Sequence, residues 1–119
     1  MSQSETLSFD REEVLEEFDN DLVLLGRMLE VFRGDCDNRL PKIKAAFESG
    51  KLDTLADEAH GIKSGVGNFF ASQSYETASA LEVAGRDGNS EAIGPLIQKL
   101  ESELEVLKKD IEETCQNSG

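Results

Sequence analysis

Apolar side chains recur at three- and four-residue intervals along two long stretches of this 119-residue sequence. Between residues 21 and 49 the series is Leu22, Leu25, Met28, Leu29, Phe32, Cys36, Leu40, Ile43 and Phe47. Between residues 90 and 115 it is Ile93, Leu96, Ile97, Leu100, Leu104, Leu107 and Ile111. This spacing places apolar groups on one face of an α-helix, so each stretch is predicted to form a long helix with one buried face.

A proline lies inside the first of these stretches. Pro41 removes a backbone hydrogen bond and clashes with the preceding turn, so we expect a kink or a brief break near residues 37–41. The apolar spacing stays in phase across Pro41, which favours one kinked helix over two separate ones. Pro95 lies in the first turns of the last helix, where a missing N–H has little effect.

Three shorter helices are predicted from capping residues and breaks in the apolar pattern. Asp10 begins a capping box, which predicts a short helix over residues 11–18. Asp53 is predicted to cap a helix that ends around residues 65–69, and Ser72 opens the next helix. The inward face of that fourth helix is predicted to carry Tyr75, Ala78, Leu81 and Gly85.

These elements predict an all-α fold. The four longer helices are joined by loops of about two to six residues, which is typical of an antiparallel four-helix bundle. The short additional N-terminal helix is expected to cover one end. Residues 9–115 would form the bundle, and residues 1–8 and 116–119 are expected to be flexible termini. A kinase or receiver domain does not fit into this sequence beside the bundle, so either an isolated module or an excised piece is expected.

The charge balance limits the kinds of partner. Twelve Lys and Arg against 25 Asp and Glu give a net charge of −13, which argues against nucleic acid and anionic membranes. The acidity is explained either by solubility alone or by steering toward a basic protein surface. No signal peptide or membrane-length apolar run is present, so a cytoplasmic monomer is expected. Cys36 and Cys115 have no metal-ligand spacing, and no metal site is predicted.

The only histidine of the chain lies within the third predicted helix, the one that follows Asp53. On a helical wheel, a buried seam forms from Leu55, Ala59, Ile62 and Val66. His60 points roughly 130° away from the centre of this seam and is expected to face outward. Imidazole is nucleophilic in its neutral form, which is well populated near neutral pH because the unperturbed pKa of histidine is about 6.5.

Five residues are predicted to surround His60 on the same helical face: three are small, and the other two are Asp57 and Lys63. Ala56, Ser64 and Gly67 would leave room for a bulky protein-borne phosphoryl donor. Lys63 lies one turn on and is predicted to stabilise the phosphoryl oxygens as a mobile point charge. The alternative for Lys63 is a solvated side chain that pairs with an acid of the same helix, such as Asp57 or Glu58.

The motif Ala59-His60-x-Ile62-Lys63-x-x-x-Gly67-Asn68-x-x-Ala71 resembles that of histidine-containing phosphotransfer (HPt) domains. The resemblance extends from about Leu22 to Leu107 and includes Leu81-Glu82-x-x-Gly85-Arg86-x-Gly88. Two positions depart from the family pattern. Ser64 and Phe70 stand where the family has glycine, and Phe70 is expected either to complete the core or to join an apolar docking surface, with the core favoured.

The resemblance implies a phosphorelay intermediate of a two-component system. His60 would accept a phosphoryl group from a receiver aspartate or from a kinase relay and pass it to a response-regulator receiver aspartate. The expected partners are therefore receiver domains and a hybrid or other histidine kinase. The chain would bind no cofactor, because the partner receiver supplies the magnesium. It would be no enzyme in its own right, and Gly65-Val66-Gly67 lacks the spacing of a nucleotide-binding loop.

Glu82 is a possible orienter of the imidazole. A carboxylate that accepts from Nδ1–H would fix the tautomer and leave Nε2 as the nucleophile, whereas the alternative is an exposed acid on an acidic helix. Two other functions are conceivable for a helical bundle of this kind. One is a non-phosphorylated helical adaptor that only binds receiver domains. The other, a carboxylate-bridged metal enzyme, is discarded because it needs inward-facing Glu-x-x-His pairs and His60 faces out.

Overall fold

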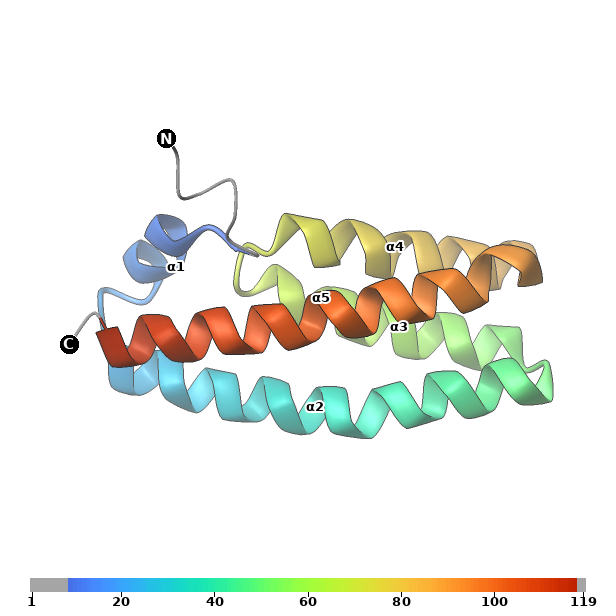
Figure 1. Cartoon of the computed structure of the whole chain (residues 1–119), viewed down its shortest axis with the longest axis horizontal. Coiled ribbons are helices and arrows are strands. Elements are labelled where there is room, and N and C mark those ends of the chain that lie inside the picture. The colour runs from blue at the N-terminus through green and yellow to red at the C-terminus, as the bar shows by residue number, and fades with distance from the viewer. Residues whose placement is uncertain (1–8, 118–119) are drawn as a thin grey trace.

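The computed structural model describes residues 9–117, with side chains to residue 116. Its helices are α1 (Arg11–Glu17), α2 (Leu22–Ser49), α3 (Leu52–Gly67), α4 (Ser72–Asp87) and α5 (Ser90–Asn117) (Figure 1). The described range contains no strand, so the all-α prediction is confirmed. The last helix includes residues 116 and 117, which were predicted to belong to a flexible C-terminus, so the prediction is wrong for these two residues. The flexibility predicted for residues 1–8 and 118–119 concerns positions outside the described residues.

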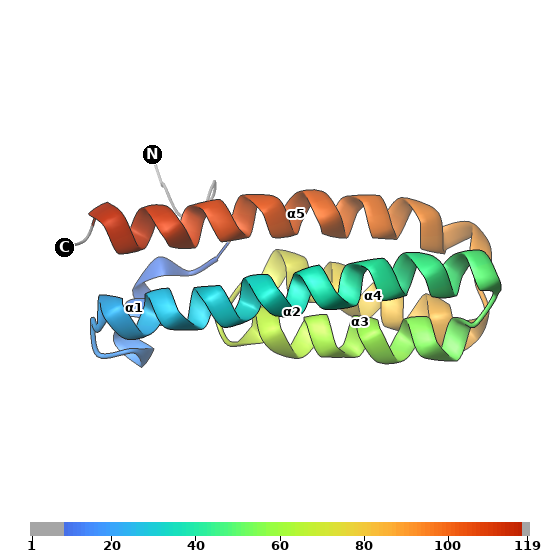
Figure 2. The same ribbon diagram turned by 90° about the horizontal axis from the view of Figure 1, so that it is seen from below.

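The four long helices run alternately in opposite directions and form an antiparallel bundle (Figure 1). α3 packs against α2 and α4, and α5 packs against the same two helices from the other side. α2 and α5 extend beyond α3 and α4 at one end of the bundle, and α1 lies at that end (Figures 1 and 2). The N–H of Asp10 donates to the carbonyl of Phe70 at 3.2 Å, which ties the start of α1 to the α3–α4 connection. The predicted arrangement of a bundle with a short covering helix is confirmed.

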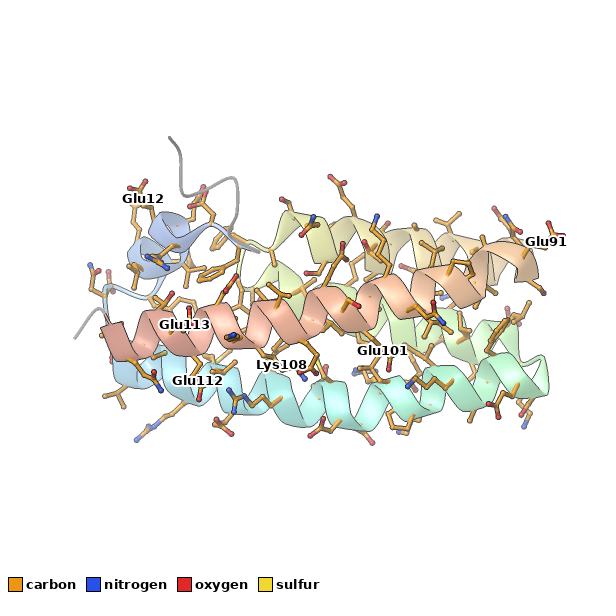
Figure 3. The ribbon with its side chains drawn as sticks, viewed as in Figure 1. Glu12, Glu91, Glu101, Lys108, Glu112 and Glu113 are labelled. Carbon is orange, nitrogen blue, oxygen red and sulfur yellow. The ribbon has the colours of Figure 1, made fainter. Side chains whose placement is uncertain are left out.

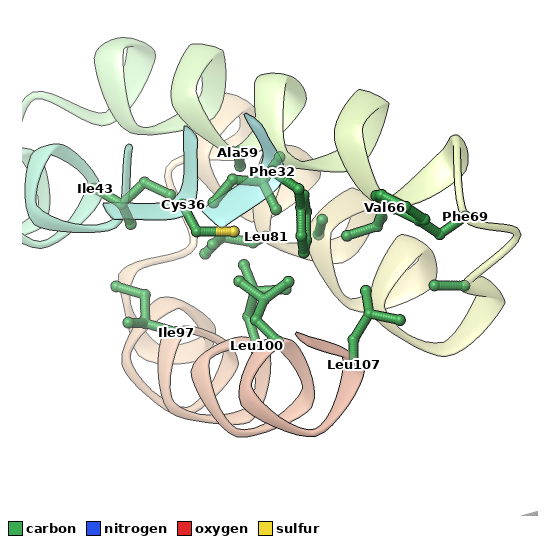
Figure 4. Close-up of a cluster of buried hydrophobic side chains, with 14 of the residues drawn as sticks. Phe32, Cys36, Ile43, Ala59, Val66, Phe69, Leu81, Ile97, Leu100 and Leu107 are labelled. Carbon is green, nitrogen blue, oxygen red and sulfur yellow. The ribbon is translucent and has the colours of Figure 1, made fainter. Parts of the chain in front are cut away.

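The core is formed by the seams that the apolar spacing predicted. Phe32 and Cys36 of α2 face Leu81 of α4 and Leu100 of α5 across the interior (Figure 4). The Phe32 ring also meets that of Phe69 edge to face, with ring centroids 5.3 Å apart. The predicted α3 seam is completely buried: Leu55, Ala59, Ile62 and Val66. No helix within residues 9–117 combines the length and hydrophobicity needed to cross a bilayer.

The helix ends follow local chemistry, with one exception. The Asp10 carboxylate accepts from the N–H of Glu13 at 3.1 Å, and Gly50 ends α2 in the left-handed region at φ 73°. α2 is a single helix through Pro41, so the predicted brief break does not occur. The prediction that Asp53 caps α3 is wrong. The turn after Gly50 makes Lys51 the cap, and Asp53 lies in the first turn, where its charge complements the helix dipole.

The buried face of α4 differs from the predicted one. It consists of Ser74, Thr77, Ala78, Leu81, Ala84 and Gly85. Tyr75 was predicted to point inward, but the residue is 43% exposed. Thr77 is accommodated in the interior because its hydroxyl donates to the carbonyl of Gln73 at 3.2 Å within the same helix. Tyr75 is consequently turned toward the outer surface, next to α3.

Ion pairs join α2 to α5 along their shared edge. Lys44 pairs with Glu101 at 2.5 Å, and Arg33 pairs with Glu112 at 3.4 Å. Figure 3 shows Glu101 and Glu112 on the side of α5 that borders α2. Because such surface pairs contribute about 0–1 kcal/mol each, the buried seams account for most of the packing energy and the pairs chiefly favour one alignment of the two helices.

Candidate functional site

His60 lies in the middle of α3, on a helix held by neighbours on two sides. Its side chain is 57% exposed, which confirms the prediction that it faces away from the buried seam. The imidazole is therefore open to a large partner while its backbone is fixed in a packed helix. A position on a helix limits the motion of the side chain more than a position on a loop does.

The Nδ1 atom of His60 faces a carboxylate from the neighbouring helix. It lies 3.3 Å from Oε1 and 3.2 Å from Oε2 of Glu82 in α4. An ionised carboxylate can only accept a hydrogen bond, so in the neutral imidazole this contact favours the tautomer with the proton on Nδ1 and the lone pair on Nε2. Nε2 forms no hydrogen bond with the described part of the chain. The predicted contact between Glu82 and His60 is thus present.

Glu82 is shared among three basic side chains. Its Oε1 lies 2.9 Å from Nζ of Lys63, and its Oε2 lies 3.8 Å from Nη2 of Arg86. The hydrogen bond from Lys63 lowers the pKa of Glu82 below its usual range, with burial acting in the opposite direction and the bond from His60 adding to the lowering. Glu82, only 17% exposed, therefore remains ionised at neutral pH.

Lys63 pairs across helices rather than along its own helix. The alternative pairing with Asp57 or Glu58 does not occur, because Asp57 pairs with Arg86 and Glu58 pairs with Arg39. The ammonium group of Lys63 also lies 5.8 Å from the centroid of the Tyr75 ring. The hydrogen bond to Glu82 raises the pKa of Lys63, so the cation persists throughout the physiological range. It lies on the α4 side of His60.

Two of the three small residues border the open face around His60. Ser64 is exposed, and its hydroxyl donates to the carbonyl of His60 at 3.2 Å. The hydroxyl proton of Ser64 is therefore used in a hydrogen bond within α3. Gly67 is partly buried beside the Tyr75 ring. The prediction that Ala56 leaves space for a partner is wrong, because this residue is completely buried. Gly85 has no side chain, and α4 therefore approaches α3 closely enough to cover Ala56.

Phe70 replaces a family glycine at a position where the backbone is left-handed, with φ 54°. This conformation costs a residue with a Cβ about 1–2 kcal/mol. The ring is partly buried and packs against the core, which agrees with the favoured expectation. It also borders a groove of about 380 Å³ with Gly67 and Tyr75, so part of the ring belongs to the surface beside α3.

A second ionic cluster beside α3 was missed by the sequence interpretation. Arg39 of α2 donates from Nε to Asp35 at 3.0 and 3.1 Å and from Nη1 to Glu58 of α3 at 2.9 Å. Its guanidinium group lies over Gly61, the residue after His60. The sequence contained one signal of this contact, since a glycine in the interior of a helix lowers helix stability and requires a packing reason.

The described residues contain no group of three or more His, Cys, Asp or Glu side chains arranged to hold a metal ion. Cys36 is buried in the core, and burial raises the pKa of its thiol to about 12. Burial also raises the pKa of the Cys115 thiol, the second free cysteine. Neither cysteine belongs to the surface around His60.

Comparisons with known proteins identify the family of this chain. The family model described as the Hpt domain matches residues 27–110, which is well over half of the chain. Neither a search of curated proteins nor a search of solved structures returned a match. The matched range includes α3 and α4 with His60, Lys63 and Glu82. The chain therefore belongs to the Hpt domain family, whose members transfer phosphoryl groups in two-component phosphorelays and interact with the kinases and receiver domains of those relays.

Proposed function

We propose that His60 is the residue that is phosphorylated, and that it carries a phosphoryl group between two partner proteins. The donor is a receiver aspartate or a kinase relay, and the acceptor is a response-regulator receiver aspartate. One observation carries this proposal: the exposed imidazole has its Nδ1 held by the Glu82 carboxylate, at 3.2 Å, while Nε2 is left open.

The contact with Glu82 supports a specific transfer step. The Nε2 lone pair attacks the phosphorus of the aspartyl phosphate, an N–P bond forms, and the P–O bond to the aspartate breaks. The electrons of the broken bond leave with the aspartate carboxylate. The imidazole ring, which keeps its Nδ1 proton, becomes positively charged, and the adjacent Glu82 carboxylate stabilises that charge. Onward transfer is the same step in reverse, with the electrons of the N–P bond returning to Nε2.

Lys63 is proposed to approach the phosphoryl oxygens once His60 is phosphorylated. Before transfer, the ion pair with Glu82 holds the ammonium group near the imidazole, because the same carboxylate contacts both groups. Charge in a phosphoryl-transfer transition state is spread over three equatorial oxygens, so a nearby cation contributes stabilisation. The chain is proposed to need no cofactor of its own, and a magnesium ion held by the receiver supplies further charge neutralisation.

The adaptor alternative makes a different use of the same surface. A bundle that only binds receivers needs an accessible face but no oriented nucleophile. The carboxylate placed against Nδ1, with its own pKa lowered by Lys63, favours phosphotransfer because a docking surface gains nothing from fixing an imidazole tautomer.

Labelling with two phosphoryl donors tests the proposal. One donor is a receiver domain of the source organism phosphorylated with radiolabelled acetyl phosphate, and the other is potassium phosphoramidate, which phosphorylates imidazole without a protein partner. We expect acid-labile, base-stable phosphate on the wild-type chain and none on His60→Gln. A matched variant, Gln73→Ala on the exposed side of α4, should label normally. Label that persists in His60→Gln would contradict the assignment, and receiver binding without any label would support the adaptor.

A further inference from the structure

We propose that Arg39 is a docking contact, donating hydrogen bonds from its guanidinium group to a neutral carbonyl oxygen of the receiver domain that covers His60. This inference rests on the proposed function, because it concerns the partner of that site. Arg39 lies on α2, a different helix from the three side chains around Nδ1 of His60. It therefore adds a second point of recognition on the opposite edge of the exposed face of α3.

The guanidinium group is held in place from two helices. Asp35, one turn earlier on α2, accepts from Nε with both carboxylate oxygens. Glu58 of α3 accepts from Nη1 at 2.9 Å. The side chain remains 31% exposed, and Nη2 forms no hydrogen bond within the described residues. Arg39 thus presents a donor to a partner in a position that is already ordered, which reduces the conformational entropy lost on binding.

Gly61 makes this position possible. A Cβ atom at residue 61 would overlap Cζ, Nη1 and Nε of Arg39. The guanidinium group can lie across α3 only because this residue has no side chain. The cluster consequently lies directly beside the backbone of His60, on the side of α3 that faces α2.

A groove beside the cluster reaches Gly61 and Ser64, which lie one residue and one helical turn after His60. This groove of about 450 Å³ runs between α2 and α3 and is lined by Val31, Phe32, Asp35, Gly61, Ser64 and Asn68. Of these residues, Asp35 accepts hydrogen bonds from Arg39, and Gly61 leaves the space that the guanidinium group occupies. Ser64 follows His60 by one helical turn and bonds its carbonyl. A domain large enough to cover the imidazole therefore also covers the guanidinium edge.

The local charge indicates which acceptor fits. One positive charge on Arg39 and two negative charges on Asp35 and Glu58 leave the cluster with a net charge of −1. A partner carboxylate would be repelled by this arrangement, whereas a main-chain carbonyl can accept from Nη2 without that penalty. The contact should accordingly be insensitive to ionic strength, unlike a salt bridge between the two proteins.

Two variants and one control separate docking from a merely structural role. Gly61→Ala displaces the guanidinium group while it keeps every charge, and Arg39→Met removes the donor. Gly26→Ala is the control, because Gly26 lies inside a helix as Gly61 does, here α2, and has open space around its Cβ direction. Each chain is assayed for KM and kcat of transfer from a phosphorylated receiver, for labelling by phosphoramidate, and for affinity toward the unphosphorylated receiver by calorimetry.

We expect both variants to raise KM and the dissociation constant about tenfold, as for one lost hydrogen bond to a charged donor. The kcat value and the phosphoramidate labelling rate should stay at the wild-type level, and the effect should be the same at 50 and 500 mM salt. An unchanged KM and affinity, or an equal loss of labelling by both donors, would overturn the docking role. An effect that disappears at high salt would overturn the neutral acceptor.

Failure of the proposed function leaves a different pattern. In that case the wild-type chain takes no label from either donor, while the calorimetric comparison of Arg39→Met with wild type still reports whether Arg39 contacts the receiver. If Gly61→Ala fails to fold, as judged by circular dichroism, Arg39→Met decides the outcome.

Discussion

Nδ1 of His60 and the carboxylate of Glu82 meet at 3.2 Å across the α3–α4 interface. The two residues are 22 positions apart in sequence and come together only because α3 and α4 pack side by side. The orientation of the imidazole is therefore a property of the packed bundle and not of the motif around His60. Changes at Glu82 should affect chemistry at a histidine that remains exposed.

Replacing Glu82 should slow phosphotransfer without unfolding the chain. Glu82→Ala removes the acceptor for Nδ1–H and the negative charge, and we expect a tenfold to hundredfold lower single-turnover transfer rate, corresponding to about 1.5–3 kcal/mol for a bond involving a charged group. Glu82→Gln keeps an acceptor oxygen but no charge, so its loss should be smaller. Nitrogen-15 NMR should show mixed imidazole tautomers in Glu82→Ala. Transfer at the wild-type rate in that variant would exclude the orienting role.

Removing the Lys63 ammonium should raise the pKa of Glu82. The hydrogen bond from Lys63 is the largest cause of the lowered pKa of this carboxyl group. A lowered native pKa stabilises the fold above the unfolded-state value of about 4.3, and that contribution is lost as pH falls through the native pKa. In Lys63→Met the stability that is lost on acidification should be smaller. Carbon-13 NMR of the Glu82 carboxyl group, titrated from pH 6 downward, measures the shift.

Lys44→Met provides the control for that titration, because Lys44 pairs with Glu101 on the other side of the bundle. It should leave the titration of Glu82 unchanged. An identical Glu82 titration in Lys63→Met and wild type would show that the ion pair between Lys63 and Glu82 does not persist in solution.

A side chain at residue 85 should destabilise the α3–α4 contact. A Cβ atom on Gly85 would lie 3.0 Å from the carbonyl oxygen of Leu52 and 3.2 Å from Cβ of Ala56. Since the backbone carbonyl cannot move aside cheaply, we expect Gly85→Ala to lower the free energy of unfolding by about 1–3 kcal/mol. Gly26→Ala, which meets open space, should be neutral or stabilising by up to about 1 kcal/mol. Urea unfolding compares the two, and equal stability would contradict the close approach.

The buried thiol of Cys36 should weaken the fold at high pH. Its native pKa of about 12 lies above the ordinary value of 9.0, so the unfolded chain loses this proton first as pH rises. Stability is unaffected below pH 9 and declines between the two values. At pH 10.5 the decline is about 2 kcal/mol, from 1.36 kcal/mol per unit. The stability advantage of wild type over Cys36→Ala should shrink by that amount between pH 8 and 10.5, and a constant difference in urea unfolding would refute the shift.

The bundle was largely predictable because the apolar residues that specify it recur at regular intervals in the sequence. Leu55, Ala59, Ile62 and Val66 follow one helical stripe, and a stripe must be buried against something. Ala56 shows where this reasoning ends. The wheel placed Ala56 correctly on the side of His60, but it contains no information about how near another helix comes. That distance is set by Gly85, a residue on a different helix.

Which side chains pair with one another was less predictable than which face of each helix is buried. The sequence offered Asp57 or Glu58 as partners for Lys63 on its own helix, and only the packed structure selects Glu82. Tyr75 was assigned inward with Ala78 and Leu81, yet Thr77, whose hydroxyl donates to a carbonyl of its own helix, occupies the interior instead. Arg39 was overlooked because its contacts join residues 19 and 22 positions away through space, and Gly61 alone hinted at them.

Every basic side chain that borders His60 already has a carboxylate partner: Lys63 has Glu82, Arg86 has Asp57, and Arg39 has Asp35 and Glu58. If a phosphoryl group is transferred to His60, Lys63 would therefore exchange one anionic partner, the Glu82 carboxylate, for another, the phosphoryl group. No unpaired cation would be waiting for it among these side chains. Exchange of this kind leaves little net driving force in either direction. If His60 carries the phosphoryl group as proposed, the direction of transfer would depend on the relative concentrations and phosphorylation states of the two partners.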